Sequence, residues 1–248
     1  MTIHEQATTF VAPDPVTWQT PNTDSPSPWR RGLIALNDAY RILTLNAVER
    51  RYQQRALGRL ARGERLGTLG NRIQDEATTR ERANQWLMQL IQLGLRPDHL
   101  CVEYGCGSLW CAQPIIRHLQ PGRFIGLDLT DRFYELGRQR LSGLVVEKQA
   151  RMAVISRRTL RDVAALRPDF VYSHRVLHHV QRRGLMRYVR NLVSMLHERT
   201  VLVIENIRPI LPDGSVKGRV YGADDIQRHL PKNWQCRQES FGLVVTQA

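Results

Sequence analysis

A short apolar run that ends in a glycine-rich turn constrains the fold of this chain more than any other feature. Residues 100–109 read LCVEYGCGSL, so a run typical of a buried strand leads into Gly105 and Gly107. Glycine lets the backbone approach a ligand closely, and the amides of a following helix can donate hydrogen bonds to a carboxylate or phosphate. The segment therefore predicts a strand, a turn and a helix arranged around a bound ligand.

A second strand follows at the spacing of a nucleotide-binding unit. It is expected over residues 123–129 and carries an acidic residue, Asp128, about twenty residues after the turn. Such a carboxylate accepts hydrogen bonds from ribose hydroxyls. A dinucleotide site usually has a third glycine after the first two, but Leu109 and Trp110 stand there. The unit therefore indicates an adenosine-containing cofactor, and the missing third glycine argues against a dinucleotide.

The turn and the segments after it resemble class I S-adenosylmethionine (SAM)-dependent methyltransferases. Glu103, two residues before the first glycine, is typical of motif I in that family. Further along the chain, four segments are similar to the post-I region, to motif IV and to the fifth strand. In chain order they are residues 118–128, 134–137, 169–180 and 201–206. The resemblance covers residues 96–248, with five elements in the right order.

This resemblance implies an α/β fold with a doubly wound, Rossmann-like seven-stranded sheet that ends in an antiparallel hairpin. The alternation of apolar strands and amphipathic helices along the chain agrees with that fold. Strands are expected at 100–104, 123–129, 151–156, 169–174, 200–206, 234–241 and 242–246, and helices at 109–119, 132–142, 159–166, 182–197 and 223–229.

The resemblance also implies which residues bind SAM. The family often has Asp or Asn after the third strand for the adenine amine, whereas here Ser156 or a backbone amide would meet the adenine. The family usually has a glycine or small residue where Leu109 stands. The cofactor-binding candidates are Glu103, Gly105, Cys106 and Gly107 in the first strand and turn, Asp128 and Leu129 after the second strand, Ser156 after the third, and Ser173 in the fourth.

Three histidines after the fourth strand are the catalytic candidates. His174, His178 and His179 follow the strand whose carboxyl end is where doubly wound sheets place chemistry, and histidine can act as a base near neutral pH. We expect His178 to lie nearest the methyl acceptor. His179 matches a histidine frequent at this place in the family, and for all three a structural role is the alternative. Glu205, at the end of the fifth strand, either orients the substrate or is a satisfied strand-end carboxylate.

The chain before the methyltransferase-like part divides into two segments. Residues 1–28 are rich in Pro, Thr, Ser and Asp and predict a disordered tail. Residues 29–95 have apolar stripes at helical spacing and predict an N-terminal helical cap, with a helix from about Thr79 that stops at Gly94. In methyltransferases of this type such helices commonly cover the cofactor and shape the substrate entrance. A plain structural cap or a dimer surface is the alternative.

The chain is strongly basic, with a formal net charge of +13. Twelve arginines stand against six acidic residues between residues 29 and 82. A basic face can follow phosphates, or it can meet an anionic glycan, a nucleotide-linked sugar or an anionic lipid surface. A solvated arginine-rich face is the plain alternative. The sequence after the fourth strand lacks the Asn/Asp-Pro-Pro-aromatic turn of base-amine methyltransferases, so nucleic acid is not favoured as the partner.

These features predict an enzyme that moves a methyl group from SAM to an O or N atom of a small or carrier-bound metabolite by metal-free, in-line transfer. No metal-binding set of residues is expected. An RNA methyltransferase is one alternative, prompted by the basic N-terminal helices. A non-catalytic SAM-binding partner subunit is another, prompted by the unusual adenine region.

The sequence gives no sign of a membrane span or of export. It has no run of eighteen apolar residues and no basic-then-apolar pattern at its start. The four cysteines, Cys101, Cys106, Cys111 and Cys236, have no C-x-x-C spacing and are expected to be small buried side chains in a reducing compartment. A cytoplasmic location is therefore expected.

Overall fold

The computed structural model describes residues 76–205 and 221–248, together with Gln54 and Gly58. The expected tail over 1–28 and most of the expected helical cap over 29–95 lie outside these residues. The described part of the cap contains α3 (Glu76–Gln92). The chain leaves this helix at Gly94, whose φ of +98° is easy only for glycine, so the expected stop is confirmed.

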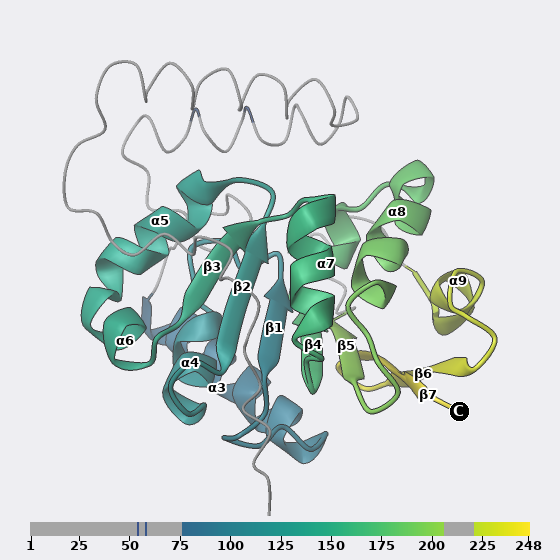
Figure 1. Ribbon diagram of the computed structural model, residues 1–248, viewed down its shortest axis with the longest axis horizontal. Helices are drawn as coiled ribbons and strands as arrows, with labels where there is room; N and C mark the ends of the chain where they lie inside the picture. The colour runs from purple at the N-terminus through teal and green to yellow at the C-terminus, as the bar shows by residue number, and fades with distance from the viewer. Residues whose placement is uncertain (1–53, 55–57, 59–75, 206–220) are drawn as a thin grey trace, which may run out of the picture.

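Seven strands form one sheet in the order β3-β2-β1-β4-β5-β7-β6 (Figure 1). The first five pair in parallel, and β7 pairs antiparallel with both β5 and β6. This arrangement confirms the expected doubly wound sheet and its terminal hairpin. The strands are β1 (Cys101–Tyr104), β2 (Phe124–Asp128), β3 (Arg151–Val154), β4 (Phe170–Ser173), β5 (Val201–Glu205), β6 (Trp234–Glu239) and β7 (Gly242–Gln247).

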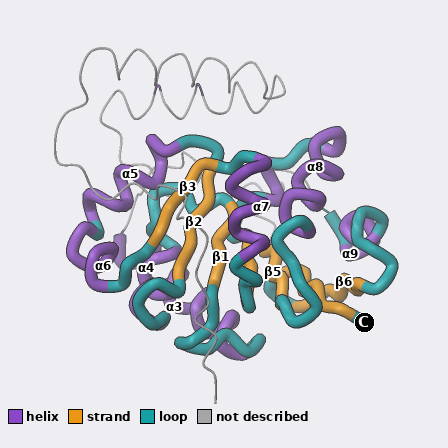
Figure 2. The backbone as a smooth tube through the Cα atoms, in the orientation of Figure 1, coloured by secondary structure: helices purple, strands orange, loops and turns teal. Residues whose placement is uncertain are grey.

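Helices cover both faces of the sheet (Figures 1 and 2). One face is covered by α3 with α4 (Ala112–His118), α5 (Asp131–Arg140) and α6 (Ser142–Glu147), whose apolar side chains share one core cluster. The other face is covered by α7 (Arg157–Ala165), α8 (Arg182–Val193) and α9 (Ala223–Gln227), which share a second cluster. A short 3₁₀ helix, η2 (Leu177–His179), joins β4 to α8.

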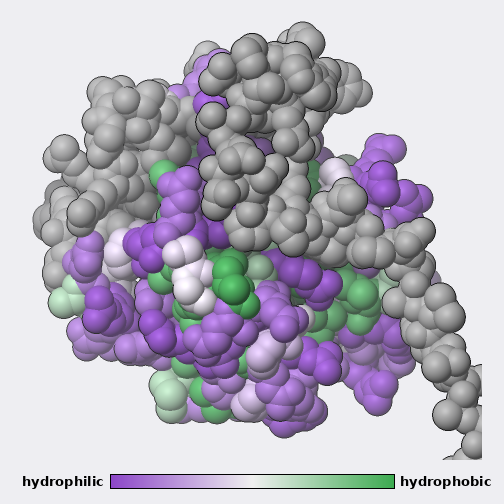
Figure 3. Space-filling model, turned by 60° about the vertical axis from the view of Figure 1, so that its left-hand side comes forward, coloured by the Kyte–Doolittle hydropathy of each residue, from purple (hydrophilic) through white to green (hydrophobic). Residues whose placement is uncertain are grey.

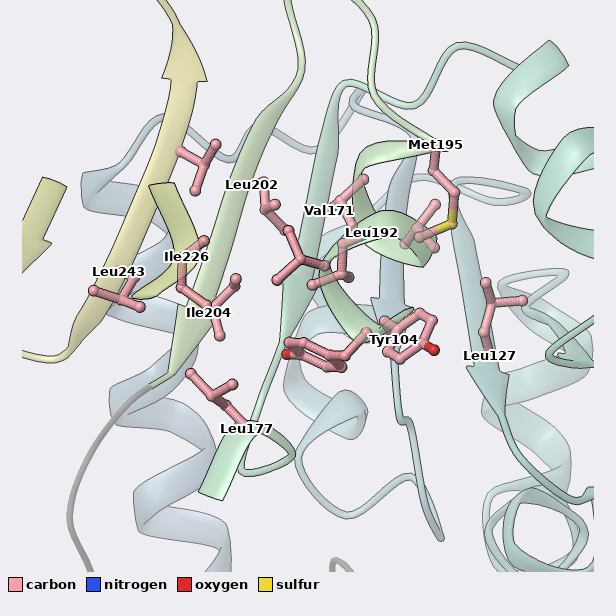
Figure 4. Close-up of a cluster of buried hydrophobic side chains, with 14 of the residues drawn as sticks. Tyr104, Leu127, Val171, Leu177, Leu192, Met195, Leu202, Ile204, Ile226 and Leu243 are labelled. Atoms are coloured by element: carbon pink, nitrogen blue, oxygen red, sulfur yellow. The ribbon is translucent and has the colours of Figure 1, made fainter. Parts of the chain in front are cut away.

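Alternate residues along the buried strands contribute side chains to opposite clusters. Leu202 and Ile204 of β5 belong to the cluster under α7, α8 and α9, whereas Val203 belongs to the other cluster. Figure 4 shows the cluster under α7, α8 and α9, where Leu192 and Met195 lie over the sheet. Each large apolar side chain buried in this way contributes about 1.5–3 kcal/mol of transfer free energy.

The strand order reverses direction between β1 and β4. From β1 the chain winds outward to β2 and β3, and from β4 it winds the other way to β5. In doubly wound sheets the crevice outside the carboxyl ends of two such strands is where ligands bind. The glycine turn after β1 and the histidines after β4 both leave the sheet at this point.

Three features differ from the sequence-based expectation by more than two residues. The helix after the glycine turn begins at Ala112, not at 109, because Leu109 has a φ of +59°, which no α-helix accepts. A separate helix, α6, follows α5 where only one helix was expected. The helix after β4 ends at Val193, four residues before the expected end.

Within residues 76–205 and 221–248, no helix has both the length and the apolar character needed to cross a bilayer. On the face shown in Figure 3, the described residues are mostly hydrophilic, with small apolar areas between them. All four cysteines are free thiols, and Cys101, Cys106 and Cys111 are buried.

Candidate functional site

The glycine turn after β1 is built tightly against the end of β2 and the loop after β4. The backbone amides of Gly105 and Cys106 both donate to the carbonyl oxygen of Leu127, at 2.7 and 3.0 Å. Gly105 has a φ of +88°, and a Cβ there would lie 2.4 Å from a methyl carbon of Val176. A side chain at position 105 would therefore collide with its surroundings, which explains the glycine.

Asp128 ties the turn to the end of β2. Its Oδ2 accepts a hydrogen bond from the amide of Gly107 at 2.7 Å, and its Oδ1 accepts one from the amide of Leu129, also at 2.7 Å. Burial raises the pKa of Asp128 to about 6, although these backbone donors act to lower it. A carboxylate has about four lone-pair sites, so both oxygens can still accept a further donor such as a ribose hydroxyl.

Glu103 presents a buried carboxylate beneath the turn. It is 1% exposed, and among the described residues its Oε2 has no hydrogen-bond partner. Burial raises the pKa of Glu103 to about 8; the neighbouring Tyr172 hydroxyl acts to lower it, and the negative charge of Asp128 adds to the rise. A buried carboxyl group in this state is suited to a ligand that brings a positive charge or a hydrogen-bond donor.

Leu109 takes the backbone conformation that a glycine would adopt. Its φ of +59° lies in the left-handed region, and its side chain is fully buried. Space for that side chain exists because residue 137 of α5 is a glycine: a Cβ there would lie 2.8 Å from Leu109 Cβ and 2.4 Å from the Ser108 carbonyl oxygen. The turn has a leucine where a third glycine is usual, and the glycine on the facing helix provides the space for it.

Arg140, one helical turn after Gly137, also holds this segment. Its guanidinium lies 3.7 Å from the centre of the Trp110 ring and donates to the Ser108 carbonyl oxygen and to Gln113 Oε1, both at 3.2 Å. The sequence motif gave no indication of this residue, because the contact joins α5 to a turn about thirty positions earlier. The one local indication in the sequence is that Arg140 stands three positions after Gly137, which places both residues on the same side of a helix.

Two of the expected cofactor residues have other hydrogen-bond partners in this structure. The Ser156 hydroxyl caps α7 by accepting from the Thr159 amide at 3.0 Å. The Ser173 hydroxyl donates to the Tyr104 carbonyl oxygen at 3.0 Å and joins the ends of β4 and β1. Their contacts with a cofactor stay predictions, as do those of Cys106 and Leu129.

The three histidines separate into two environments. His178 and His179 lie together in η2, with their ring centres 3.9 Å apart. His174 directly follows β4 and is buried, and its Nε2 lies 3.4 Å from Oε1 of Glu205 at the end of β5. Both residues were candidates from the sequence, but their contact with each other was not predicted. The structure brings them together because β4 and β5 are neighbours.

Comparison with known proteins relates this chain to others by structure. No protein-family model matches its sequence, and no curated protein matches it either. A SAM-dependent methyltransferase from Anabaena variabilis superposes with a TM-score of 0.62 at 13% identity, covering 82% of this chain and 96% of that one. The magnesium protoporphyrin IX methyltransferase of Synechocystis with bound SAH (S-adenosylhomocysteine) gives 0.55 at 15% identity, covering 77% and 94%.

These likenesses extend over the sheet and its helices, and at such low identity they bear on the fold alone. The expectation from the sequence is thus confirmed: this chain has the fold of the class I SAM-dependent methyltransferases.

Proposed function

We propose that this chain is an SAM-dependent methyltransferase that moves a methyl group to an O or N atom of a small or carrier-bound metabolite. The observation that carries the proposal is Glu103: a buried carboxyl oxygen without a partner among the described residues, directly below a glycine turn at the switch point of the sheet. A structural strand end would satisfy that oxygen internally. A ligand with a cationic amine would satisfy it on binding.

The residues around the turn fit SAM in three respects. Glu103 would accept from the amine of its amino-acid part, Asp128 has lone pairs left for the ribose hydroxyls, and Gly105 keeps the turn free of a side chain. When bound, SAM supplies a methyl group on a positively charged sulfur, which is open to attack by a nucleophile. The chain's own residues hold, orient and enclose the reactants.

Alignment is the main contribution expected from the protein. Holding two reactants in attack geometry can lower the barrier by about 7 kcal/mol or more. A protein base is needed only for an acceptor that loses its proton early. We propose in-line transfer without a metal ion, and His174, His178 and His179 remain the candidates for the base. The cytoplasmic location and the domain division stay predictions.

The experiment that tests this function separates it from its two alternatives. The full chain is melted with and without SAH and is then incubated with methyl-labelled SAM and, separately, the small-molecule and RNA fractions of a cell extract. A higher Tm with SAH and label in a small-molecule product is the expected result. Label in RNA instead supports an RNA methyltransferase, and binding without any transfer supports a non-catalytic subunit. No change in Tm and no label would refute the proposal.

A further inference from the structure

His174 and Glu205 meet at the carboxyl ends of β4 and β5. These strands pair in parallel with Ser173 opposite Ile204, so the next residue of each emerges at the same edge. The 3.4 Å between Nε2 of His174 and Oε1 of Glu205 joins two side chains that are only 6% and 10% exposed. The pair lies at the edge of the sheet where this fold places its chemistry.

The loop after β4 orients the carboxylate of the pair. Glu205 accepts a hydrogen bond from the backbone N–H of Arg175. Arg175 has a φ of +57°, a conformation that costs a non-glycine residue free energy. Residues held in this way cluster at functional sites, where the surrounding structure offsets the cost.

Trp86 of α3 covers the imidazole of His174. The two ring centres are 4.8 Å apart with an angle of 39° between the planes, and the Trp86 side chain is buried. Because Oε1 of Glu205 is the acceptor beside Nε2, we assign the ring proton to Nε2. This leaves a lone pair on Nδ1, which is buried and has no hydrogen-bond partner among the described residues.

We propose that His174 takes the proton of the methyl acceptor at Nδ1, and that Glu205 is a positioning residue that acts through His174. The inference rests on the proposed function. The O–H or N–H bond of the acceptor breaks, its electron pair stays on the acceptor atom, and the proton bonds to Nδ1. The Glu205 carboxylate stabilises the imidazolium, which later gives the proton to water. A buried carboxylate also orients the imidazole of Ser-His-Asp triads, with the roles of the two ring nitrogens exchanged.

Burial disfavours the charged form of both members of the pair, so a proton held on His174 depends on the ionised carboxylate of Glu205. Burial lowers the pKa of His174 to about 3, and the positive charges of Arg175 and His178 act in the same direction. Burial raises the pKa of Glu205 to about 7, against the charge of Arg175. Burial also raises the pKa of the Cys111 thiol, and the charges of Glu103 and Glu205 add to the rise. Glu205 therefore changes its charge near neutral pH, and only its ionised form can stabilise the imidazolium of His174.

The first test reads the ring directly and needs no substrate. The full chain is labelled with ¹⁵N, and the ring nitrogens of His174 are assigned by comparison with His174→Gln. At pH 8 we expect a neutral ring with its proton on Nε2 and a bare Nδ1, and a change in both signals as the pH falls through about 7. In Glu205→Gln the amide oxygen still accepts from Nε2, so the tautomer should persist while the change near pH 7 disappears. A proton on Nδ1 at pH 8 overturns the inference.

The second test measures transfer from methyl-labelled SAM to the small-molecule fraction of a cell extract. His174→Gln should lower the rate roughly 10²- to 10⁴-fold, the range of general base catalysis, and leave the Kd for SAH within about twofold. The wild-type rate should rise with pH through about 7, and Glu205→Gln should lose that rise. His229→Gln, which changes a histidine after α9, is the matched control and should keep the wild-type rate.

The outcomes separate the base from the function. A folded His174→Gln variant that binds SAH and transfers at the wild-type rate overturns the inference alone. A loss seen only in His178→Gln does the same and supports His178 as the base. If the wild-type chain binds no SAH and transfers no label, the proposed function fails and the base assignment fails with it. Circular dichroism melts of each variant identify any loss that is due to unfolding.

Discussion

The buried side chain of Leu109 fits against α5 only because residue 137 is a glycine. The two positions are in close contact: a Cβ at 137 would lie 2.8 Å from Leu109 Cβ and 2.4 Å from the carbonyl oxygen of Ser108. The glycine turn and α5 are therefore one packing unit, although they are separated in the chain by the whole of β2.

Gly137→Ala should destabilise the protein. Overpacking of a well-packed site costs about 1–3 kcal/mol, which exceeds the gain that alanine brings to a helix. Urea unfolding of the full chain measures the change. Gly143→Ala is the matched control, because a Cβ there meets nothing within 4 Å, and its stability should be unchanged or slightly higher. Equal effects of the two substitutions would show that the turn does not press on α5.

Arg140→Gln should weaken SAH binding without unfolding the chain. The substitution removes the contact with the Trp110 ring and the hydrogen bond to Ser108, which together hold the segment after the glycines. The combined loss, about 1–2 kcal/mol, corresponds to roughly a tenfold higher Kd by calorimetry. Arg138→Gln, whose carboxylate partner is Glu135, is the control in the same helix. An unchanged Kd in Arg140→Gln would remove Arg140 from the cofactor site.

Asp128→Asn should weaken SAH binding roughly ten- to a hundredfold, because hydrogen bonds to a charged acceptor contribute about 1.5–3 kcal/mol. Asparagine keeps one acceptor oxygen, so part of the bonding to the Gly107 and Leu129 amides persists. Asp128→Ala leaves both buried amides without that partner and should also lower the Tm. If Asp128→Asn binds SAH within about twofold of wild type, the ribose assignment is wrong.

Glu103 should release a proton when SAH binds at pH 7. With a pKa of about 8 the carboxyl group is mostly protonated before binding, and an amine cation beside it favours the charged form. Calorimetry in two buffers of different ionisation enthalpy should show release of about 0.5–1 proton per SAH bound. Glu103→Gln should show a release near zero. An equal release in the variant would point to another group.

The same carboxyl group should make the protein less stable as the pH rises. Its folded pKa of about 8 lies above the ordinary value of 4.5, so its contribution to stability is complete below 4.5 and is lost as the pH rises through 8. His174, whose pKa is lowered, opposes this trend only below its ordinary value of 6.5. Between pH 6.5 and 8.5 the free energy of unfolding should therefore fall more steeply for wild type than for Glu103→Gln. Parallel curves for the two proteins would contradict the raised pKa of the buried Glu103.

The sequence predicted what depends on local patterns. Apolar runs and turn residues placed the seven strands to within about two residues, and Gly94 ended α3 as expected. The glycine turn and Asp128 were predicted as neighbours because their spacing is fixed by one strand-turn-helix-strand unit. The structure joins them through the Gly107 amide.

The remaining features depend on contacts between distant parts of the chain. His174 and Glu205 are thirty-one positions apart, and only the pairing of β4 with β5 brings them together. The separate α6 follows from a break after α5 that no strong turn residue announces. Arg140 lies on a helix face that looks solvated in the sequence, since nothing local shows that Trp110 packs there.

The reversal of strand order between β1 and β4 separates the proposed site into two parts. The proposed donor side is built from β1, β2 and the turn that α5 braces, whereas the proposed acceptor side is built from the ends of β4 and β5. Under the proposed function, substitutions confined to the ends of β4 and β5 should therefore change the choice of methyl acceptor without changing the affinity for the methyl donor, so the two specificities of the site could be altered separately.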